Sequence, residues 1–236
     1  MANDASPPAP SDRRARRKAE TRARLLDGAR VVFARQGVDA TRINEITEEA
    51  DIGFGSFYNH FESKDAIVAA LVEEQAVGLA AAIDAATEGV DDVAEIVSVA
   101  HRALIQHALR DTDLGWLLVR LEASHDVVSL ALGPYAARDL ERGIAAGRFA
   151  VDDAAIALVA SGGALLATVR AALQGRFVGD VGVAHAAAVL RIFGVPASEA
   201  AEVASRPMPT VDAPAPSAGG PGRPVPGSPR SATPRG

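Results

Sequence analysis

The chain lacks cysteine altogether, so neither a disulfide framework nor a thiolate metal site can form anywhere along its 236 residues. Aromatic residues make up only 4% of the chain. Because β-strands favour aromatic and β-branched side chains, this composition favours helices over sheets. No run of 18 apolar residues occurs without a charge, and the N-terminus has no apolar signal-peptide core. We therefore expect a cytoplasmic protein whose helices pack through alanine, leucine and valine.

The net charge of −6 is distributed unevenly along the chain. Residues 1–36 carry nine Lys or Arg against four Asp or Glu, whereas residues 66–200 carry nine against seventeen. A basic first segment joined to an acidic body favours a local contact with phosphate groups. A basic helix face that is merely solvated is the alternative explanation.

Helical periodicity fills the chain between two ends of low complexity. Apolar residues recur at helical spacing over residues 25–33, and Gly37 is expected to end that helix. No confident strand pattern occurs, so the predicted fold class is all-α. We expect four segments in chain order: a disordered arm (1–12), a three-helix unit (13–65), a larger helical domain (66–205) and a disordered Pro/Gly-rich tail (206–236).

Polar residues with capping preference predict where the helices begin. Thr41 is expected to cap the second helix, and Ser63 to cap a helix that runs to about Thr87. Asp92, with Glu95 three residues later, resembles a capping box at the start of a helix that ends near Arg110. The remaining helices should be separated at Asp113, the Gly133-Pro134 pair, Asp152 and Asp180.

Residues 41–64, TRINEITEEADIGFGSFYNHFESK, predict a short amphipathic helix, a tight turn and a second short helix. This is the layout of a helix-turn-helix, in which the second helix enters the major groove of DNA. Phe57 and Phe61 lie four residues apart and should share the packed face of the second helix. The side chains that then project elsewhere can hydrogen-bond to bases or phosphates: Ser56, Tyr58, Asn59 and His60.

Many positions of this segment, in register, resemble the signature of TetR-type transcriptional regulators. The matching positions are Thr41, Ile46, Ala50, Ile52, Gly55, Phe57-Tyr58, His60-Phe61 and Ser63-Lys64-Asp65, within a similarity that covers about residues 18–78. The resemblance implies a homodimer whose N-terminal heads bind a near-palindromic operator, usually as a repressor. It also implies a larger C-terminal helical domain that binds a small molecule and supplies the dimer interface.

Three positions depart from that pattern. Asp51 occupies the inter-helix turn where glycine is usual, and aspartate tolerates the left-handed geometry such a turn requires. Gly53, rather than Ser or Thr, caps the recognition helix and offers no hydroxyl to a phosphate. Phe54 follows, either as extra packing three residues before Phe57 or as an apolar contact to a thymine methyl group.

The predicted DNA contacts combine this helix with basic and helix-start residues. Thr41 and Lys64 lie at helix starts, where backbone N–H groups favour a phosphate, and Gly55 would let the backbone approach the duplex. A basic arm over residues 13–18 can follow phosphates or enter the minor groove, unless it is only a solubilising start. The full predicted set is Arg16, Arg17, Lys18, Thr41, Arg42, Gly53, Phe54, Gly55, Ser56, Tyr58, Asn59, His60 and Lys64.

Two later stretches are dense in small residues, which let a second helix approach closely. We expect them to form the dimer seam, in line with the last two long helices that the resemblance implies. Tight packing within one subunit is the alternative explanation. The predicted interface residues are Ala160, Gly163, Ala164, Ala167, Ala187 and Leu190.

A ligand pocket requires mostly apolar walls and a few convergent polar groups. Trp116 and Arg120 lie four residues apart and could together hold an anionic or flat molecule, or they are a core indole and a surface cation. His101 and His107 are six residues apart and form no local metal pair, so we expect neither a metal nor a cofactor. The predicted pocket residues are His101, Ile105, Trp116, Arg120, Tyr135, Leu166 and Arg170.

The leading hypothesis is therefore a dimeric transcriptional repressor that a small molecule releases from its operator. A DNA-binding architectural or accessory protein without an effector is the alternative, and a filled core between residues 91 and 175 would favour it. An enzyme is not expected, because G-x-S-x-G, H-E-x-x-H and Walker A segments are absent. The pair Gly53 and Gly55 lacks the third glycine and the preceding strand of a dinucleotide site.

Overall fold

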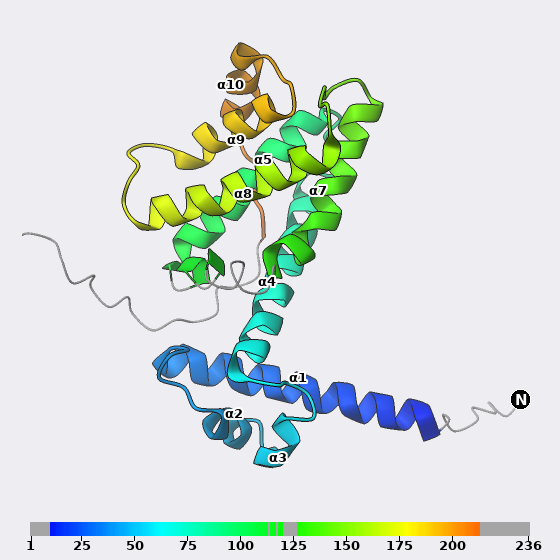
Figure 1. The fold of residues 1–236 in the computed structure, drawn as a ribbon, viewed down its shortest axis with the longest axis vertical. Helices are drawn as coiled ribbons and strands as arrows, with labels where there is room; N and C mark the ends of the chain where they lie inside the picture. Colours follow the sequence, from blue (N-terminus) through cyan, green and yellow to red (C-terminus); the bar gives the residue numbers. More distant parts are fainter. Residues whose placement is uncertain (1–9, 113, 117, 120–126, 213–236) are drawn as a thin grey trace, which may run out of the picture.

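A computed structural model describes residues 10–112, 114–116, 118–119 and 127–212. Within these residues the structure contains helices and no strand, which confirms the all-α fold class. Figure 1 labels the helices as α1 (Pro10–Gln36), α2 (Ile43–Glu49), α3 (Phe54–Phe57), α4 (Lys64–Ala86), α5 (Val93–Arg110), α7 (Val127–Ala145), α8 (Ala154–Leu173), α9 (Val181–Ile192) and α10 (Ala197–Ser205).

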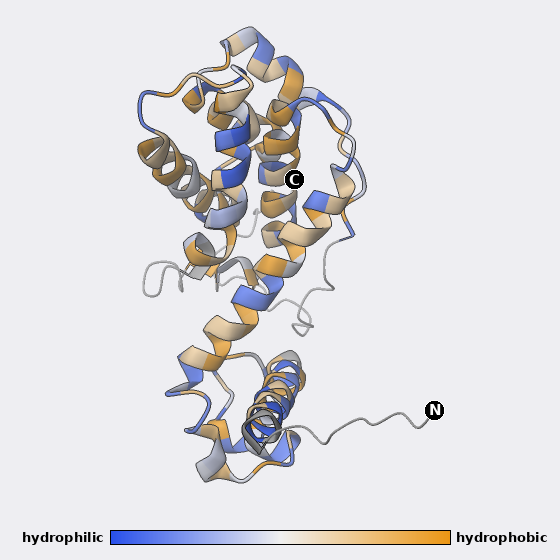
Figure 2. Cartoon of the chain, turned by 90° about the vertical axis from the view of Figure 1, so that its right-hand side faces the viewer, coloured by the Kyte–Doolittle hydropathy of each residue, from blue (hydrophilic) through white to orange (hydrophobic). Residues whose placement is uncertain are grey.

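The helices form a small head and a larger body that are joined by α4. Helices α1, α2 and α3 make the head, and α5 with α7 to α10 makes the body (Figure 1). Ser63 caps α4 as expected, since its hydroxyl accepts a 3.1 Å bond from the Ala66 N–H. Figure 2 shows hydrophobic residues along this helix from the head into the body. The expected boundary at residue 65 therefore falls in the first turn of a helix that both parts share.

Packing in the head requires a close approach of α1 to α2. A Cβ atom on Gly28 would lie 2.9 Å from the carbonyl oxygen of Ile46 and 3.1 Å from the Cβ of Ala50. The missing side chain lets the two helices touch through backbone, and Leu25, Ala29 and Phe57 fill the surrounding core. The head thus has a hydrophobic core of its own, which the first turns of α4 complete.

Two details of the head differ from the sequence-based expectations. Helix α1 begins at Pro10, inside the segment expected to be a disordered arm, because proline is tolerated in a first helical turn and the following residues favour helix. Arg42, not Thr41, is the N-cap of α2. The hydroxyl of Thr41 instead donates a 2.7 Å bond to the carbonyl of Gly37, which closes the turn that follows α1.

In the body, the Gly133-Pro134 pair does not separate helices, as the sequence analysis expected, but lies inside α7. Pro134 is exposed, so water can solvate the carbonyl group that loses its helical partner. Asp180 caps α9 as expected, and α8 is capped by Asp153, one residue after the predicted Asp152. Asp113 lies outside the described residues.

The start of α5 and the end of α10 are tied together by charge. Asp92 caps α5 as expected, but Glu95 does not complete a capping box and accepts a 2.7 Å bond from Arg206. The chain after α10 therefore does not leave the body at residue 206, where the disordered tail was expected to begin. Val211 packs against a core cluster that includes Leu79 of α4. Residues 213–236 lie outside the described part of the chain.

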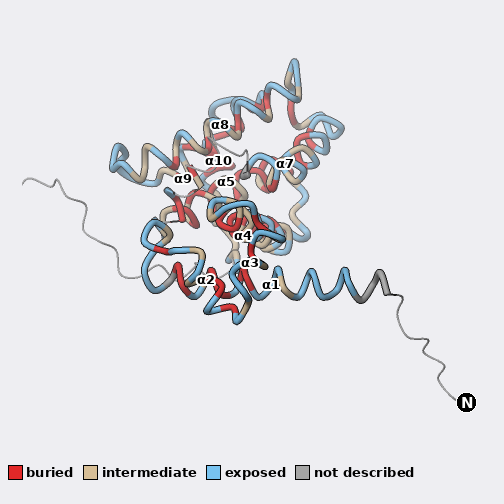
Figure 3. The backbone as a smooth tube through the Cα atoms, turned by 60° about the horizontal axis from the view of Figure 1, so that its bottom comes forward, coloured by how far each residue is buried: buried red, intermediate tan, exposed pale blue. Residues whose placement is uncertain are grey.

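Among the residues that the structure describes, two helices, α4 and α8, are long and apolar enough to cross a membrane by length and composition alone. In α4, 44% of the most apolar window is buried inside the structure, whereas in α8 only 22% is buried. Figure 3 shows α8 along one edge of the body with much of its length exposed. Core packing therefore accounts for much of the apolar character of α4, while α8 presents an apolar face that its own subunit leaves open.

A chain of polar side chains crosses the body core between α5, α9 and α8. His101 Nδ1 lies 3.1 Å from His185 Nε2, and His185 Nδ1 lies 3.0 Å from the hydroxyl of Thr168. Burial, and then the neighbouring His185, lowers the pKa of His101 to about 3. Burial also lowers the pKa of His185 to about 4. Both rings are therefore neutral at pH 7 and hold three helices together.

Acid should destabilise the body through these two rings. Below the ordinary histidine pKa of 6.5, the histidines of the unfolded chain bind protons, whereas in the folded state His185 binds one only near pH 4 and His101 only near pH 3. Because the unfolded state binds more protons in this window, the free energy of unfolding falls as pH falls, by up to about 1.4 kcal/mol per pH unit for each ring. Urea denaturation at successive pH values measures the slope. A His101→Gln protein should show a shallower slope, and an equal slope would contradict this origin.

Candidate nucleic-acid interface and ligand cavity

The second helix of the predicted helix-turn-helix is α3, a single turn at the outer end of the head (Figure 1). Its inner side is held by Phe57 and Phe61, which are both buried with ring centroids 5.7 Å apart. This confirms the expected packed face. The other side chains of residues 53–60 are thereby directed away from the core.

The outer side of α3 exposes two aromatic rings and several polar groups. Phe54 is 51% exposed and Tyr58 is 52% exposed, with their rings in an edge-to-face contact at 5.6 Å. Phe54 therefore packs on Tyr58 rather than filling the core, and half of its surface remains open to a partner. Asn59, Gly53 and Gly55 are also exposed, while Ser56 and His60 are half-buried.

The turn before α3 is fixed by Asp51 and Arg24. Asp51 adopts a left-handed backbone with φ of 51°, as the sequence analysis expected at this position. The guanidinium of Arg24, on α1, donates to the backbone carbonyls of Ala50 and Asp51 at 2.7 and 2.8 Å. Arg24 thus stabilises the carbonyl end of α2 and sets the direction in which α3 leaves. Sequence reasoning missed this residue because nothing distinguishes it within a basic run.

Two of the predicted phosphate ligands are used inside the head. Lys64 Nζ donates to the backbone carbonyls of Val38 and Thr41 at 2.8 and 3.0 Å, and to that of Asp39 at 3.4 Å. These carbonyls occupy all three ammonium protons. The hydroxyl of Thr41 is buried and bonded to Gly37. Both side chains therefore hold the loop between α1 and α2, and the phosphate contact expected at the backbone N–H groups of these helix starts stays a prediction.

Positive charge remains available on the rest of the head. Arg16, Arg17 and Lys18 are exposed on the first half of α1, which extends beyond the head in Figure 3. Arg16 pairs with Glu20 one turn later, and Arg42 at the start of α2 is exposed. Burial, followed by the charges of Lys18 and Arg22, lowers the pKa of His60. The head therefore presents cations beside a neutral imidazole near the outer face of α3.

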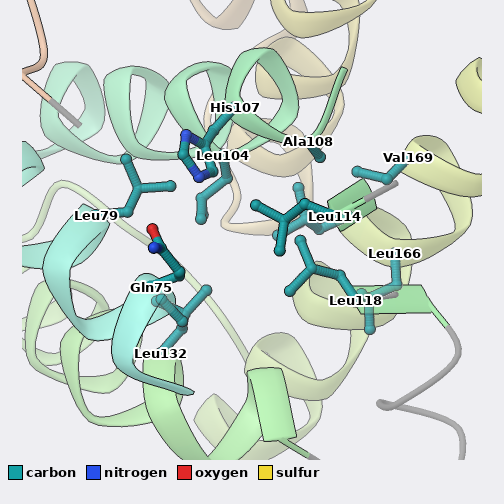
Figure 4. Close-up of a pocket in the computed structure, with 12 residues that line it drawn as sticks. Gln75, Leu79, Leu104, His107, Ala108, Leu114, Leu118, Leu132, Leu166 and Val169 are labelled. Carbon is teal, nitrogen blue, oxygen red and sulfur yellow. The ribbon is translucent and has the colours of Figure 1, made fainter. Parts of the chain in front are cut away.

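A narrow cavity lies in the body where α4, α5, α7 and α8 meet Leu114 and Leu118 (Figure 4). It measures about 30 Å³, close to the volume of one water molecule. Its lining is largely aliphatic, formed by Gln75, Ala76, Leu79, Leu104, His107, Ala108, Leu114, Leu118, Leu132, Leu165, Leu166 and Val169.

Of the predicted pocket residues, only Leu166 lines this cavity. Within the described chain, His101 belongs to the histidine chain and Ile105 to an adjacent core cluster, while Tyr135 lies under Arg138 at 5.7 Å. Trp116 is 39% exposed and Arg170 is exposed, because the helical period turns them outward from the lining leucines and valine. Arg120 lies outside the described residues. The cavity is thus walled by a different set of residues than the sequence analysis proposed.

Helix α8 turns its small and apolar residues outward. Ile156 is 67% exposed and Val159 is 74% exposed. The predicted interface residues on this helix follow the same stripe: Ala160, Gly163 and Ala167 are exposed, and Ala164 is half-buried. Ala187, on α9, is also half-buried. Leu190 is different, because it is fully buried in the core of its own subunit and leaves no surface for a partner.

Both the head and the body match descriptions of known protein families. Residues 25–71, which span most of the head and the first turns of α4, match the description of bacterial regulatory proteins of the tetR family. Residues 92–206, which span the body, match the description of a tetracyclin repressor-like C-terminal domain.

Similar proteins are DNA-binding regulators. The crystal structure of RolR in complex with its ligand resorcinol is 39% identical, covers 84% of this chain and 99% of that chain, and has a TM-score of 0.76. The regulator UidR of Escherichia coli is 34% identical over 93 residues, which are 38% of this chain and 47% of that protein. The repressor KstR2 of Rhodococcus jostii is 43% identical over 51 residues, 22% of this chain and 25% of that protein.

The chain spans about half or less of the length of these two curated relatives, whereas it matches RolR over nearly its whole length. The structural agreement with RolR covers 84% of this chain, with a TM-score of 0.76. The chain belongs to the TetR family of helix-turn-helix transcriptional regulators.

Proposed function

We propose that this protein is a dimeric repressor that binds a near-palindromic operator through α3 and is released when a small molecule enters the cavity of the body. The observation that carries this proposal is the continuity of α4. This helix begins at Lys64 in the head and contributes Gln75, Ala76 and Leu79 to the cavity wall. A molecule that moves this wall necessarily acts on the helix to which the DNA-reading head is attached.

Operator binding combines phosphate contacts with base contacts. Exposed cations on α1 and α2, including Arg16, Arg17, Lys18 and Arg42, can neutralise phosphates on either side of the groove. Asn59 is an exposed amide on the outer side of α3 and suits a bidentate contact to adenine. Exposed Phe54 suits an apolar contact to a thymine methyl group. The acidic body would be repelled by the duplex, which favours approach through the head.

The exposed face of α8 suits a second copy of the same chain. Its small residues Ala160, Gly163 and Ala167 allow another helix to approach closely, and Val159 adds apolar area that water would otherwise cover. A symmetric pairing places two heads on the same side of the duplex. Two heads about 34 Å apart match half-sites separated by one helical turn.

Release by a ligand follows from the size of the cavity. An apolar cavity that holds one benzene-sized molecule measures about 150 Å³, far more than the cavity of about 30 Å³ in this structure. A ligand must therefore push its walls apart. Leu114 lines the cavity and also belongs to the core cluster of the head, together with Leu71 of α4. Displacing this wall changes the position of the head relative to the body. Ligand and operator therefore favour different positions of the head.

A regulator with an effector is favoured over an architectural protein because RolR, which is 39% identical to this chain, has been crystallised with a small-molecule ligand. A regulatory rather than catalytic role agrees with the names of the relatives, which describe regulators and repressors. We accordingly propose a cytoplasmic protein that acts on chromosomal DNA without catalysing a reaction.

The proposal predicts specific DNA binding that resorcinol or a related small molecule abolishes. Selection from a random duplex library should yield a near-palindromic site, and a gel-shift on that site should show one complex with two copies of the chain. Resorcinol is the first probe, because RolR, 39% identical, has been crystallised with it as ligand. Failure to select any duplex sequence at low ionic strength would contradict the proposed function.

Substitutions on α3 should separate base contacts from phosphate contacts. Asn59→Ala should weaken the selected operator by about 1–3 kcal/mol and relax the preference at one base pair. Tyr58→Phe removes only a hydroxyl and should weaken all duplexes alike, by about 0.5–1.5 kcal/mol. Fluorescence anisotropy on operator and scrambled duplexes measures both effects. Gln174→Ala, an exposed amide on the body, is the matched control and should change neither. Equal losses on both duplexes for Asn59→Ala would remove it from base reading.

A further inference from the structure

At one end of the cavity lie two polar atoms without a hydrogen-bond partner among the described residues. Gln75 Oε1, from α4, and His107 Nε2, from α5, are both buried and have no hydrogen-bond partner among the described residues. Such atoms are rare in native proteins, because each one gives up its bonds to water and gains none in return. Two of them on the wall of a single cavity mark a place where one polar group, of a water molecule or of a ligand, can form hydrogen bonds.

The remainder of the cavity is apolar. Figure 4 shows Gln75 and His107 toward one end, and Leu114, Leu118, Leu166 and Val169 toward the other. No charged side chain lines the cavity among the residues that the structure describes. Burial, as the main cause, lowers the pKa of His107, so its ring is neutral at pH 7. The cavity therefore has an uncharged polar end and an aliphatic end.

We propose, building on the ligand-responsive function above, that the effector is a small uncharged molecule with an apolar body and a hydroxyl group, and that Gln75 and His107 select it by binding that hydroxyl. A hydroxyl can donate its proton to the amide oxygen and accept a hydrogen bond from an imidazole N–H at the same time. A hydrocarbon would leave both atoms unpaired. A carboxylate would be buried without a counter-charge, at a high cost in free energy.

The position of this pair explains how recognition would reach the head. Gln75 lies eleven residues after Lys64 on the same helix, which corresponds to about 16 Å along the helix axis. His107 lies on α5, which belongs to the body. A hydroxyl that bridges the two side chains therefore links the helix of the head to the body, and the apolar part of the ligand separates the other walls.

Calorimetry on the full chain tests this assignment with four probes: resorcinol, phenol, benzene and benzoate. Phenol and benzene differ by a single hydroxyl. Phenol and resorcinol should bind about 10- to 100-fold more tightly than benzene, because benzene leaves buried polar atoms unpaired. Benzoate should not bind measurably. Equal affinity for phenol and benzene, or binding of none of the four, would overturn the inference.

Two variants locate the preference on the named side chains. Gln75→Leu and His107→Leu should each reduce the ratio of phenol to benzene affinity by about tenfold while benzene itself still binds. Neither change removes a hydrogen bond made by the side-chain atom in question, so thermal stability without ligand should be kept or raised. Gln106→Leu, the residue next to His107 but not part of the lining, is the matched control and should keep the full preference. An unchanged ratio in both cavity variants would overturn the inference.

The outcomes also separate this inference from the proposed function. Release of operator DNA by phenol and benzene alike would support a ligand-responsive repressor and overturn hydroxyl recognition. A phenol preference that depends on Gln75 and His107, without any effect on the operator complex, would support hydroxyl recognition and contradict ligand-driven release.

Discussion

Helix α4 contributes to the hydrophobic core of the head and to that of the body, and the rest of this molecule depends on this constraint. Its first turns, through Ile67 and Leu71, complete the hydrophobic core of the head. Its later turns, through Leu79 and Ile83, pack against α5 in the body. A helix held rigidly at both ends cannot move in one core without a response in the other. The small cavity lies between these two contacts, so a displacement of its α4 side chains acts on a helix that the head shares.

The geometry of the DNA-reading surface is determined by polar residues that do not face DNA. Arg24 binds the carbonyls at the end of α2, and Lys64 binds those of the loop between α1 and α2. Gly28 allows α1 to touch α2 through backbone. Together these contacts fix α3 relative to α1 and to the start of α4. The exposed side chains of α3 are thereby preorganised, and little conformational entropy remains to be lost when they meet a duplex.

Local features of the fold could be predicted from the sequence, whereas features assembled from distant segments could not. The aromatic pair Phe57 and Phe61, and the left-handed Asp51, depend on neighbouring residues and were predicted correctly. Pro134 was expected to break a helix, but packing on both sides of it maintains α7 and exposes the proline to water. Cap positions were accurate to one residue: Asp153 rather than the adjacent Asp152 caps α8, and Thr41 bonds to Gly37 and leaves Arg42 as the cap of α2.

The candidate sites show the same division. The exposure of Asn59 and Tyr58 could be inferred from the period of a short helix. The hydrogen bonds of Lys64 to backbone carbonyls within the head could not, because these carbonyls lie more than twenty residues away in the sequence. The cavity combines residues of four helices and a connecting segment, so no local pattern identifies Gln75 as part of its wall. Helical periodicity alone also failed to separate the outward residues of α8 and α9 from Leu190, which faces its own core.

The central claim is that a ligand between α4 and α5 changes the separation of two heads in a dimer. The absence of cysteine allows a single spin label to be placed by Asn44→Cys, an exposed position on α2. Pulsed electron resonance then measures the distance between the two labels of a dimer with and without resorcinol or phenol. The account predicts one narrow distribution on operator DNA and a displaced one with ligand. An unchanged distribution in the presence of a bound ligand, or no distance at all because the protein is monomeric, would contradict it.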